Sequence, residues 1–291
     1  MKPRIFYFNI NYSCNNRCLY CFSHNTNGGG NNIDSSEVMK RIRDKKVSLN
    51  DIIVINGGEP TLHAEFYQIV NMLNGKAKIK IYSNGTMIDV EKLPNDIEFI
   101  IPIHGIEEDH NKITQNPKSY KQTICSLKAL QSSSIKYSIK FIVNEDMIAK
   151  NFNVLDFLVK NNLTPSEVWM ARLVETKVSI TNNYTVPDIN SVKQFISKTT
   201  NQLMGIYPIK YIDIAPCQII DGAIVDMVDE SESIFYFNDY NKNMIQTTYT
   251  KYLVTNSDCE NCPVKKHCDK IFTSYGVLEM QLDGKFKIVE E

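Results

Sequence analysis

The feature that most constrains the fold of this chain is the alternation of short apolar runs with helical patterns through most of its length. Each apolar run has the length of a strand, and helical periodicity follows it. About six such units succeed one another, which is typical of a parallel sheet or a partial barrel with helical crossovers. The expected strands are residues 5–11, 51–56, 78–82, 98–103, 136–143 and 167–173. The expected helices are residues 34–46, 64–73, 120–130, 152–160 and 192–204.

The pattern changes near residue 205. Short strand candidates follow at residues 207–214 and 223–228, and after them comes a polar, aromatic-rich stretch that ends in cysteines. We therefore predict a larger α/β domain over residues 1–205 and a small cysteine-rich domain over residues 206–291.

Composition narrows the range of partners. Of 291 residues, 43% are hydrophobic, which is ample for a core and excludes wholesale disorder. With 32 basic and 33 acidic residues, the net charge of -1 gives no broad field for nucleic acid or anionic lipid, so we expect neither as a partner. The first residues are too polar for a signal peptide, and no stretch approaches a membrane span. We expect a cytoplasmic protein.

Cysteine positions are the most informative part of the sequence. Two groups of three and two single cysteines are present: Cys14, Cys18 and Cys21; Cys259, Cys262 and Cys268; and Cys125 and Cys217. Without a secretory signal, eight cysteines favour thiols kept for metals or chemistry over disulfides. The first group cannot pair fully within itself. Cys125 falls within an apolar helical pattern, which predicts a buried, inert thiol.

Three loops that follow successive expected strands carry the candidate chemistry. Cys14, Cys18 and Cys21 follow the first strand, Gly57-Gly58-Glu59-Pro60 ends the second, and Ser83-Asn84-Gly85 ends the third. Because parallel strands present their carboxyl ends on one face, these loops should converge there. Three thiolates can hold three irons of a four-iron cluster and leave the fourth open to a ligand. A zinc site remains an alternative, although only His24 offers a local fourth ligand.

The cysteine spacing, with three and then two intervening residues, and Tyr20 before the third cysteine resemble the radical S-adenosylmethionine (SAM) superfamily. The Gly-Gly-Glu-Pro turn one strand later strengthens this resemblance, which spans residues 5 to 205. It implies a partial (β/α)6 TIM-like barrel and an enzyme that holds SAM on the open iron. In that family an electron from the cluster cleaves SAM to a 5'-deoxyadenosyl radical, which abstracts a hydrogen atom from the substrate.

The resemblance also implies roles for individual residues. Cys14, Cys18 and Cys21 would bind the [4Fe–4S] cluster, and five groups would contact SAM: Tyr20 at the adenine, the Gly57-Gly58 backbone, Glu59 at the methionine ammonium, and Ser83 and Asn84 near the ribose or carboxylate. The later segment His104-Gly105 to Thr114 departs from the family pattern. Thr114 stands where many members have arginine, and Pro102 stands where many have serine.

The C-terminal cysteines resemble the auxiliary-cluster region of the SPASM and Twitch subfamilies. Four thiols, Cys217, Cys259, Cys262 and Cys268, would fill one auxiliary [4Fe–4S] cluster completely, which suits structure or electron transfer. A zinc knuckle with four thiolate ligands is the alternative for this set.

The resemblance favours an enzyme that modifies a ribosomally made peptide by crosslinking, oxidation or epimerisation. The alternative is a dehydrogenase or cyclase that acts on a small molecule in a biosynthetic pathway. Either would need an electron donor such as a flavodoxin or ferredoxin. A remote alternative is a zinc-stabilised binding module with no enzymatic activity, although the Gly-Gly-Glu-Pro turn at a strand end argues against it.

Overall fold

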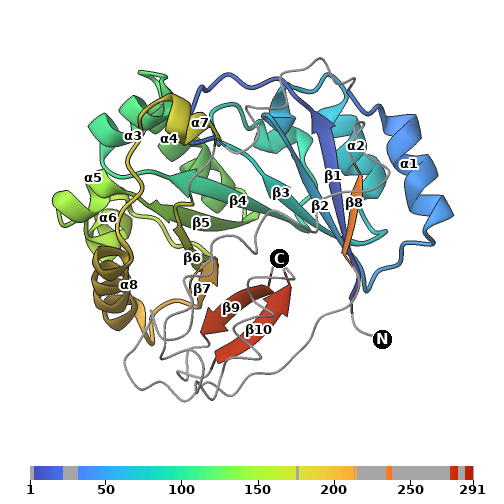
Figure 1. Cartoon of the computed structure of the whole chain (residues 1–291). Helices are drawn as coiled ribbons and strands as arrows, with labels where there is room; N and C mark the ends of the chain where they lie inside the picture. Colours follow the sequence, from blue (N-terminus) through green and yellow to red (C-terminus); the bar gives the residue numbers. More distant parts are fainter. Residues whose placement is uncertain are drawn as a thin grey trace.

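The computed structural model describes residues 3–21, 32–174, 177–212 and 214, and the backbone of three later strands. Within these residues, seven parallel strands follow one another in chain order across a curved, open sheet (Figure 1). They are β1 (Ile5–Asn11), β2 (Ile52–Gly57), β3 (Lys78–Tyr82), β4 (Ile97–Ile103), β5 (Lys136–Val143), β6 (Glu167–Arg172) and β7 (Ile209–Ile212). The predicted α/β partial barrel is confirmed.

The later described strands extend this sheet at both edges. β8 (Ile234–Phe237) pairs parallel to β1, and β9 (Gly276–Met280) pairs antiparallel to β7. β10 (Phe286–Glu290) then pairs antiparallel to β9. β7 itself follows residue 205 and pairs parallel to β6, so the sheet continues past the expected change of domain. The division at that residue stays a prediction, and the strand expected at residues 223–228 lies outside the described residues.

Helices cover the convex side of the sheet (Figure 1). They are α1 (Ser35–Asp44), α2 (Phe66–Leu73), α3 (Glu107–Thr114), α4 (Ser119–Ser132), α5 (Glu145–Ala149), α6 (Val154–Asn161), α7 (Lys177–Thr181) and α8 (Ile189–Leu203), with 3-10 turns η2 (Pro60–Leu62) and η3 (Val90–Lys92). Helix α1 begins after Asp34, whose Oδ1 accepts a hydrogen bond from the Glu37 N–H at 2.8 Å, as the sequence predicted. None of the helices in the described ranges has the length and apolar character needed to cross a membrane.

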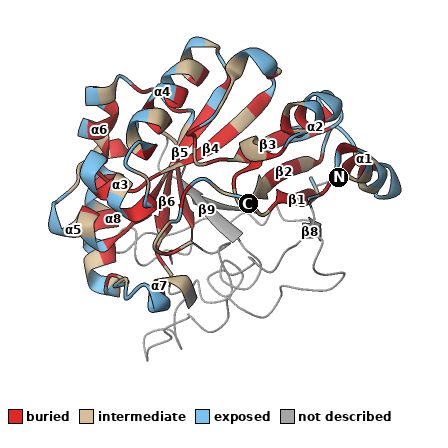
Figure 2. Ribbon diagram, turned by 90° about the horizontal axis from the view of Figure 1, so that it is seen from above, coloured by how far each residue is buried: buried red, intermediate tan, exposed pale blue. Residues whose placement is uncertain are grey.

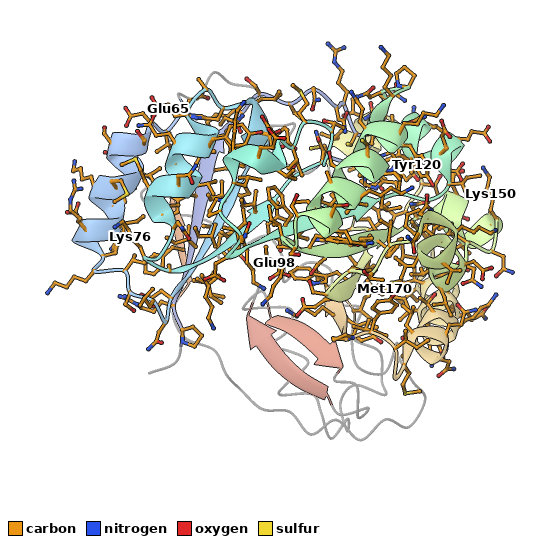
Figure 3. The ribbon with its side chains drawn as sticks, turned by 180° about the vertical axis from the view of Figure 1, so that it is seen from behind. Glu65, Lys76, Glu98, Tyr120, Lys150 and Met170 are labelled. Carbon is orange, nitrogen blue, oxygen red and sulfur yellow. The ribbon has the colours of Figure 1, made fainter. Side chains whose placement is uncertain are left out.

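The main core lies between the sheet and the helices, because alternate residues of each strand point to opposite faces. On β6, Val168 and Met170 pack in this core, whereas Trp169 and Ala171 pack on the other face with Ile100. Figure 2 shows the buried strands enclosed by helices whose outer sides are exposed. Figure 3 shows Tyr120 and Lys150 on the half of the molecule formed by α3 to α5, away from Glu65 and Lys76 beside α2.

The face of the sheet that carries Trp169 also holds ion pairs between neighbouring strands. Lys210 Nζ lies 2.8 Å from Glu167 Oε2, and the Trp169 indole N–H donates to the same oxygen at 2.9 Å. Burial would raise the pKa of Glu167, but the charge of Lys210 outweighs it and holds that pKa below its usual range. These contacts join β6 to β7.

Candidate active site

The three loops that were expected to converge do so at the carboxyl ends of β1, β2 and β3. The cysteine loop (residues 12–21) leaves β1 and is held by the loop after β2, because the Glu59 N–H donates to the Ser13 carbonyl at 2.7 Å. From the loop after β3, the Asn84 side chain donates to Asn15 Oδ1 at 2.8 Å. The strand order of a parallel sheet therefore places the candidate residues together, as predicted.

Gly57 and Gly58 are needed because the cysteine loop passes directly over them. A Cβ on Gly58 would lie 2.4 Å from the Ser13 carbonyl oxygen, and one on Gly57 would lie 2.4 Å from Asn11 Oδ1. Gly57 also has a φ of +155°, which side chains other than glycine rarely adopt. The protein's own backbone and the Asn11 side chain thus approach these two glycines closely. The contact between SAM and the Gly57-Gly58 backbone stays a prediction.

Glu59 is fully buried, and its carboxylate is fixed by neighbours on both sides. Oε1 accepts hydrogen bonds from the Thr61 N–H at 3.1 Å, the Thr61 hydroxyl at 2.7 Å and the Ser83 hydroxyl at 2.8 Å. Oε2 accepts one from the Asn84 N–H at 2.6 Å. Burial raises the pKa of Glu59 despite these donors. Thr61 was missing from the sequence prediction, although a carboxylate followed by proline, as in Glu59-Pro60, is typical of the start of a helical turn whose next N–H faces that carboxylate.

Cys14, Cys18 and Cys21 are half-buried thiols on one short loop, and none of them forms a disulfide. Burial raises the pKa of Cys18, and the nearby Cys21 and Cys14 raise it further. Burial also raises the pKa of Cys14, although the Asn16 N–H, at 3.4 Å from Sγ, acts in the opposite direction. Thiols bind metal as thiolates, so metal binding at this loop would release protons.

The donor set fits an iron–sulfur cluster. Three thiols with soft sulfur donors lie on one short loop at the carboxyl end of β1, and Asn84 Nδ2 lies 3.8 Å from Cys14 Sγ. Among the described residues, no three His, Cys, Asp or Glu side chains are arranged to hold a single metal ion. The fit therefore rests on the chemistry and the common loop of the three thiols.

Tyr20 lies under other side chains of the protein. Its hydroxyl is 2.7 Å from His104 Nδ1, and its ring lies 5.1 Å from the Tyr184 ring. Only 6% of Tyr20 is exposed. Nothing in the sequence indicated the contacts with His104 and Tyr184, and the expected place of Tyr20 against adenine stays a prediction.

Other sequence predictions fall outside this site. Cys217, Cys259, Cys262 and Cys268 lie outside the described residues, as does His24. The expectation that Cys125 is buried was wrong, because this thiol is exposed on α4. Helix α4 buries Ile124, Leu127 and Leu130, and the residue directly after Ile124 is turned about 100° from that face.

Comparison with known proteins decides the family. Residues 8–145 match the sequence profile of the Radical SAM superfamily. This part of the chain belongs to the radical SAM superfamily. A radical SAM domain implies a [4Fe–4S] cluster and SAM as cofactors, and the members of the superfamily are enzymes.

Relatives by sequence match about half of this chain. The chain is 24% identical to the Fe-coproporphyrin III synthase of Methanosarcina barkeri over 56% of its length and 42% of that protein. It is 30% identical to the S-adenosylmethionine-dependent nucleotide dehydratase of Selenomonas ruminantium over 50% of each chain. The chain thus spans about half the length of the curated relatives that it matches.

Two solved structures that contain S-adenosylmethionine share the fold at low sequence identity. Streptococcus suis SuiB bound to S-adenosylmethionine superposes with a TM-score of 0.64 over 91% of this chain and 72% of SuiB, at 14% identity. The enzyme anSMEcpe with bound AdoMet and Cp18Cys peptide superposes with a TM-score of 0.54 over 69% of this chain and 59% of that one, at 16% identity.

Proposed function

We propose that this chain reductively cleaves SAM and uses the resulting radical to abstract a hydrogen atom from its substrate. The observation that carries this proposal is the set of three thiols on one short loop beside the buried, hydrogen-bonded Glu59 carboxylate, inside a radical SAM domain. When bound, the cluster supplies the electron that breaks the carbon–sulfur bond of the sulfonium.

The chain's own residues bind and orient in this proposal. Cys14, Cys18 and Cys21 would hold three irons. Glu59 would accept the methionine ammonium at Oε2, which accepts one hydrogen bond from the protein against three at Oε1. Asn84 would lie at the same point, because its side chain reaches the Cys14 sulfur while its N–H holds Glu59. Gly57, Gly58, Ser83 and Tyr20 complete the proposed SAM site.

A ribosomally made peptide is the substrate that we propose first, with a crosslink, an oxidation or an epimerisation as the outcome. SuiB supports it, because its fold resembles 91% of this chain and SuiB has also been crystallised bound to its precursor peptide SuiA. A second candidate is a small biosynthetic molecule. The relatives by sequence favour it, because their names describe haem-pathway and nucleotide chemistry.

We also propose that residues 206–291 form a small auxiliary-cluster domain. Cys217, Cys259, Cys262 and Cys268 would bind a second [4Fe–4S] cluster, and a flavodoxin or ferredoxin would supply electrons to the enzyme. Cluster-ligating thiolates need a reducing compartment, which supports a cytoplasmic location.

Formation of 5'-deoxyadenosine tests the proposed reaction. The chain is reconstituted anaerobically with iron and sulfide, reduced with dithionite and incubated with SAM, and the product is measured by liquid chromatography and mass spectrometry. We expect product from the wild type and from the matched control Cys125→Ala, and none from the Cys14→Ala, Cys18→Ala, Cys21→Ala triple variant. Wild-type protein that binds iron but makes no 5'-deoxyadenosine would overturn the proposal.

Deuterium transfer separates the two substrate classes. Cells of the source organism are grown in deuterated medium, and their extract is divided by size into peptide and small-molecule fractions. The peptide proposal predicts that 5'-deoxyadenosine gains carbon-bound deuterium with the peptide fraction only. Transfer from the small-molecule fraction alone would establish the second candidate instead.

A further inference from the structure

Buried polar contacts join the cysteine loop to the segment from His104 to Ser119, which we call the clamp segment. It comprises the end of β4, helix α3 and the start of α4. The proposed reaction assigns no role to its two histidines, although both lie within hydrogen-bond distance of groups that lead to the cysteine loop.

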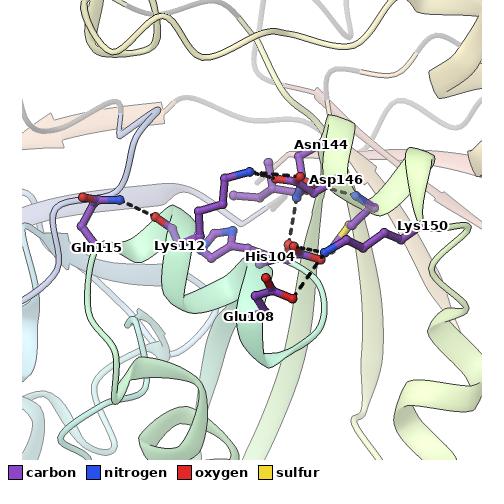
Figure 4. Close-up of polar contacts among 10 residues, drawn as sticks. His104, Glu108, Lys112, Gln115, Asn144, Asp146 and Lys150 are labelled. Carbon is purple, nitrogen blue, oxygen red and sulfur yellow. Dashed lines mark hydrogen bonds and ion pairs between the residues drawn. The ribbon is translucent and has the colours of Figure 1, made fainter.

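His104 forms the first connection. Its Nδ1 lies 2.7 Å from the Tyr20 hydroxyl. Figure 4 shows the second contact of His104, whose carbonyl accepts a hydrogen bond from Asn144 Nδ2 at 3.1 Å. His104 is 3% exposed and Tyr20 is 6% exposed. A hydrogen bond between two groups so far removed from water is costly to lose, because neither group can regain it from solvent. Tyr20 is therefore linked to the end of β4, and the His104 carbonyl there is held by Asn144, the residue that caps α5.

His110 forms the second connection, which reaches the other half of the cysteine loop. His110 Nε2 lies 3.0 Å from the Ser119 hydroxyl, which accepts a hydrogen bond from Asn16 Nδ2 at 3.3 Å. Asn116 donates to Asn16 Oδ1 at 2.9 Å. His110, Ser119 and Asn16 are each no more than 2% exposed. The two histidine rings also lie side by side, with their centroids 5.1 Å apart.

Between these connections, the backbone around Cys18 is bound to the end of α3. The Arg17 N–H donates to the Thr114 carbonyl and the Leu19 N–H donates to the Ile113 carbonyl, both at 2.9 Å. The last four carbonyls of a helix lack partners within it, so the cysteine loop satisfies two groups that α3 leaves open. These two bonds bracket Cys18 directly.

The clamp segment is itself anchored on its outer side. Lys112 Nζ pairs with Asp146 at 3.0 Å, and Lys150 Nζ pairs with the buried Asp109 at 2.5 Å (Figure 4). These pairs connect α3 to α5 and to the residue that follows it. Helix α3 therefore contacts the cysteine loop through its last carbonyls and α5 through ion pairs.

We propose that His104 and His110 are positioning residues that hold the cysteine loop in one conformation against the end of α3. The link to cluster binding rests on the proposed function, whereas the clamp itself rests on the contacts described above. The clamp segment departs from the family pattern at Thr114, and the contacts described above give this segment a role through the cysteine loop. If the cysteine loop is already held in one conformation, a cluster loses less free energy to ordering the loop when it binds.

The test compares variants of the full chain that remove single groups from the clamp. Tyr20→Phe and Ser119→Ala each remove one hydroxyl, and His104→Leu removes the acceptor for Tyr20. His104→Asn places an amide oxygen near the position of Nδ1 and serves as the conservative rescue. Tyr137→Phe is the matched control, because Tyr137 is a buried tyrosine of β5 whose hydroxyl donates to Gln131 at 2.6 Å, away from the cysteine loop.

Two measurements on the metal-free protein report on the loop. One is hydrogen–deuterium exchange of peptides that cover residues 15–21, and the other is the rate of alkylation of Cys18. We expect Tyr20→Phe, Ser119→Ala and His104→Leu to raise both rates by at least about fivefold, whereas His104→Asn and Tyr137→Phe stay near wild type. After reconstitution, the variants with a loosened loop should also show a broadened electron paramagnetic resonance signal of the reduced cluster.

Unchanged exchange and alkylation in Tyr20→Phe and Ser119→Ala would overturn the proposal, and so would equal increases in Tyr137→Phe. Tyr20→Phe and Ser119→Ala test the proposal even if His104→Leu fails to fold. The outcome is separable from the proposed function. If the variants loosen the loop but the wild type makes no 5'-deoxyadenosine, the positioning role stands and the proposed reaction falls. If the wild type makes 5'-deoxyadenosine but the variants leave the loop unchanged, the proposed reaction stands and the positioning role falls.

Discussion

At the scale of single residues, the contact between Gly58 and the Ser13 carbonyl makes a steric prediction. In Gly58→Ala, the new Cβ would overlap backbone atoms of the cysteine loop, which have no rotamer with which to avoid it. We expect the free energy of unfolding to fall by about 1–3 kcal/mol and the cluster to be lost, because the loop must move. Denaturant unfolding and iron content after reconstitution measure the two effects.

Gly75→Ala is the control for this substitution. Gly75 has a φ of +72° but nothing within 4 Å of its would-be Cβ. This variant should lose about 1–2 kcal/mol from backbone strain and keep its iron. Normal iron content in Gly58→Ala would show that the cysteine loop tolerates displacement.

Glu59 gives the second prediction at this scale. In Glu59→Gln, one carboxylate oxygen becomes an amide that must face the N–H and O–H donors of Thr61, Ser83 or Asn84. We expect a loss of about 1–3 kcal/mol in the free energy of unfolding, since buried donors lose their acceptor. SAM binding should weaken as well, measured by equilibrium dialysis on the reconstituted protein. Glu65→Gln is the control, because Glu65 Oε2 accepts from the Ser35 N–H near the surface. A Glu59→Gln variant that binds SAM as well as wild type would exclude a charge interaction at Glu59.

At the scale of secondary-structure elements, Asp51 makes a prediction about pH. It precedes β2 and joins it to the residue before β1: Arg4 Nη2 lies 2.7 Å from Oδ2, and the Ser48 N–H donates to the same oxygen at 2.7 Å. Burial acts to raise the pKa of Asp51, but Arg4 and Ser48 outweigh it and lower the pKa to about 2. An acid whose pKa is lower in the folded state stabilises the fold above its unfolded pKa, near 3.9.

That stabilisation is lost as pH falls from about 5 to about 2. The wild type should lose about 2 kcal/mol through Asp51 over this range. Asp51→Asn should start less stable at neutral pH and show a smaller fall. Denaturant unfolding at a series of pH values measures both curves, and parallel curves would show that another group carries the acid sensitivity.

The same scale shows what the sequence could predict. Strand β3 was expected at residues 78–82 and lies there, because an apolar run bounded by lysine and a Ser-Asn-Gly turn defines both ends. Helix α1 was expected at residues 34–46 and lies at Ser35–Asp44, and the Asp34 cap at its start is a local feature of the sequence. The contact of Tyr20 with His104 joins residues 84 positions apart, so no local pattern could predict it. The exposure of Cys125 was missed because the apolar helical pattern was taken to include a residue beside its buried face.

At the scale of the whole molecule, the two groups of three cysteines lie near opposite ends of the sequence. Strand β1, which precedes the first group, and strand β9, which follows the second, belong to one sheet. A second cluster and a zinc knuckle therefore make different predictions about metal content. Iron, sulfide and zinc are measured after anaerobic reconstitution of the wild type, of the triple variant Cys14→Ala, Cys18→Ala, Cys21→Ala, and of the matched variant Cys259→Ala, Cys262→Ala, Cys268→Ala.

If both groups bind cubane clusters, the wild type should hold about eight irons and each triple variant about four, because the two sites have separate ligands. Thiolate ligation alone does not distinguish iron from zinc, so the metal that remains in the first variant is the deciding quantity. Zinc retained there would make the C-terminal group a structural knuckle. In that case the C-terminal cysteine group could not accept an electron. If the reaction is a net dehydrogenation, the electron that leaves the substrate would then need an acceptor from outside the protein.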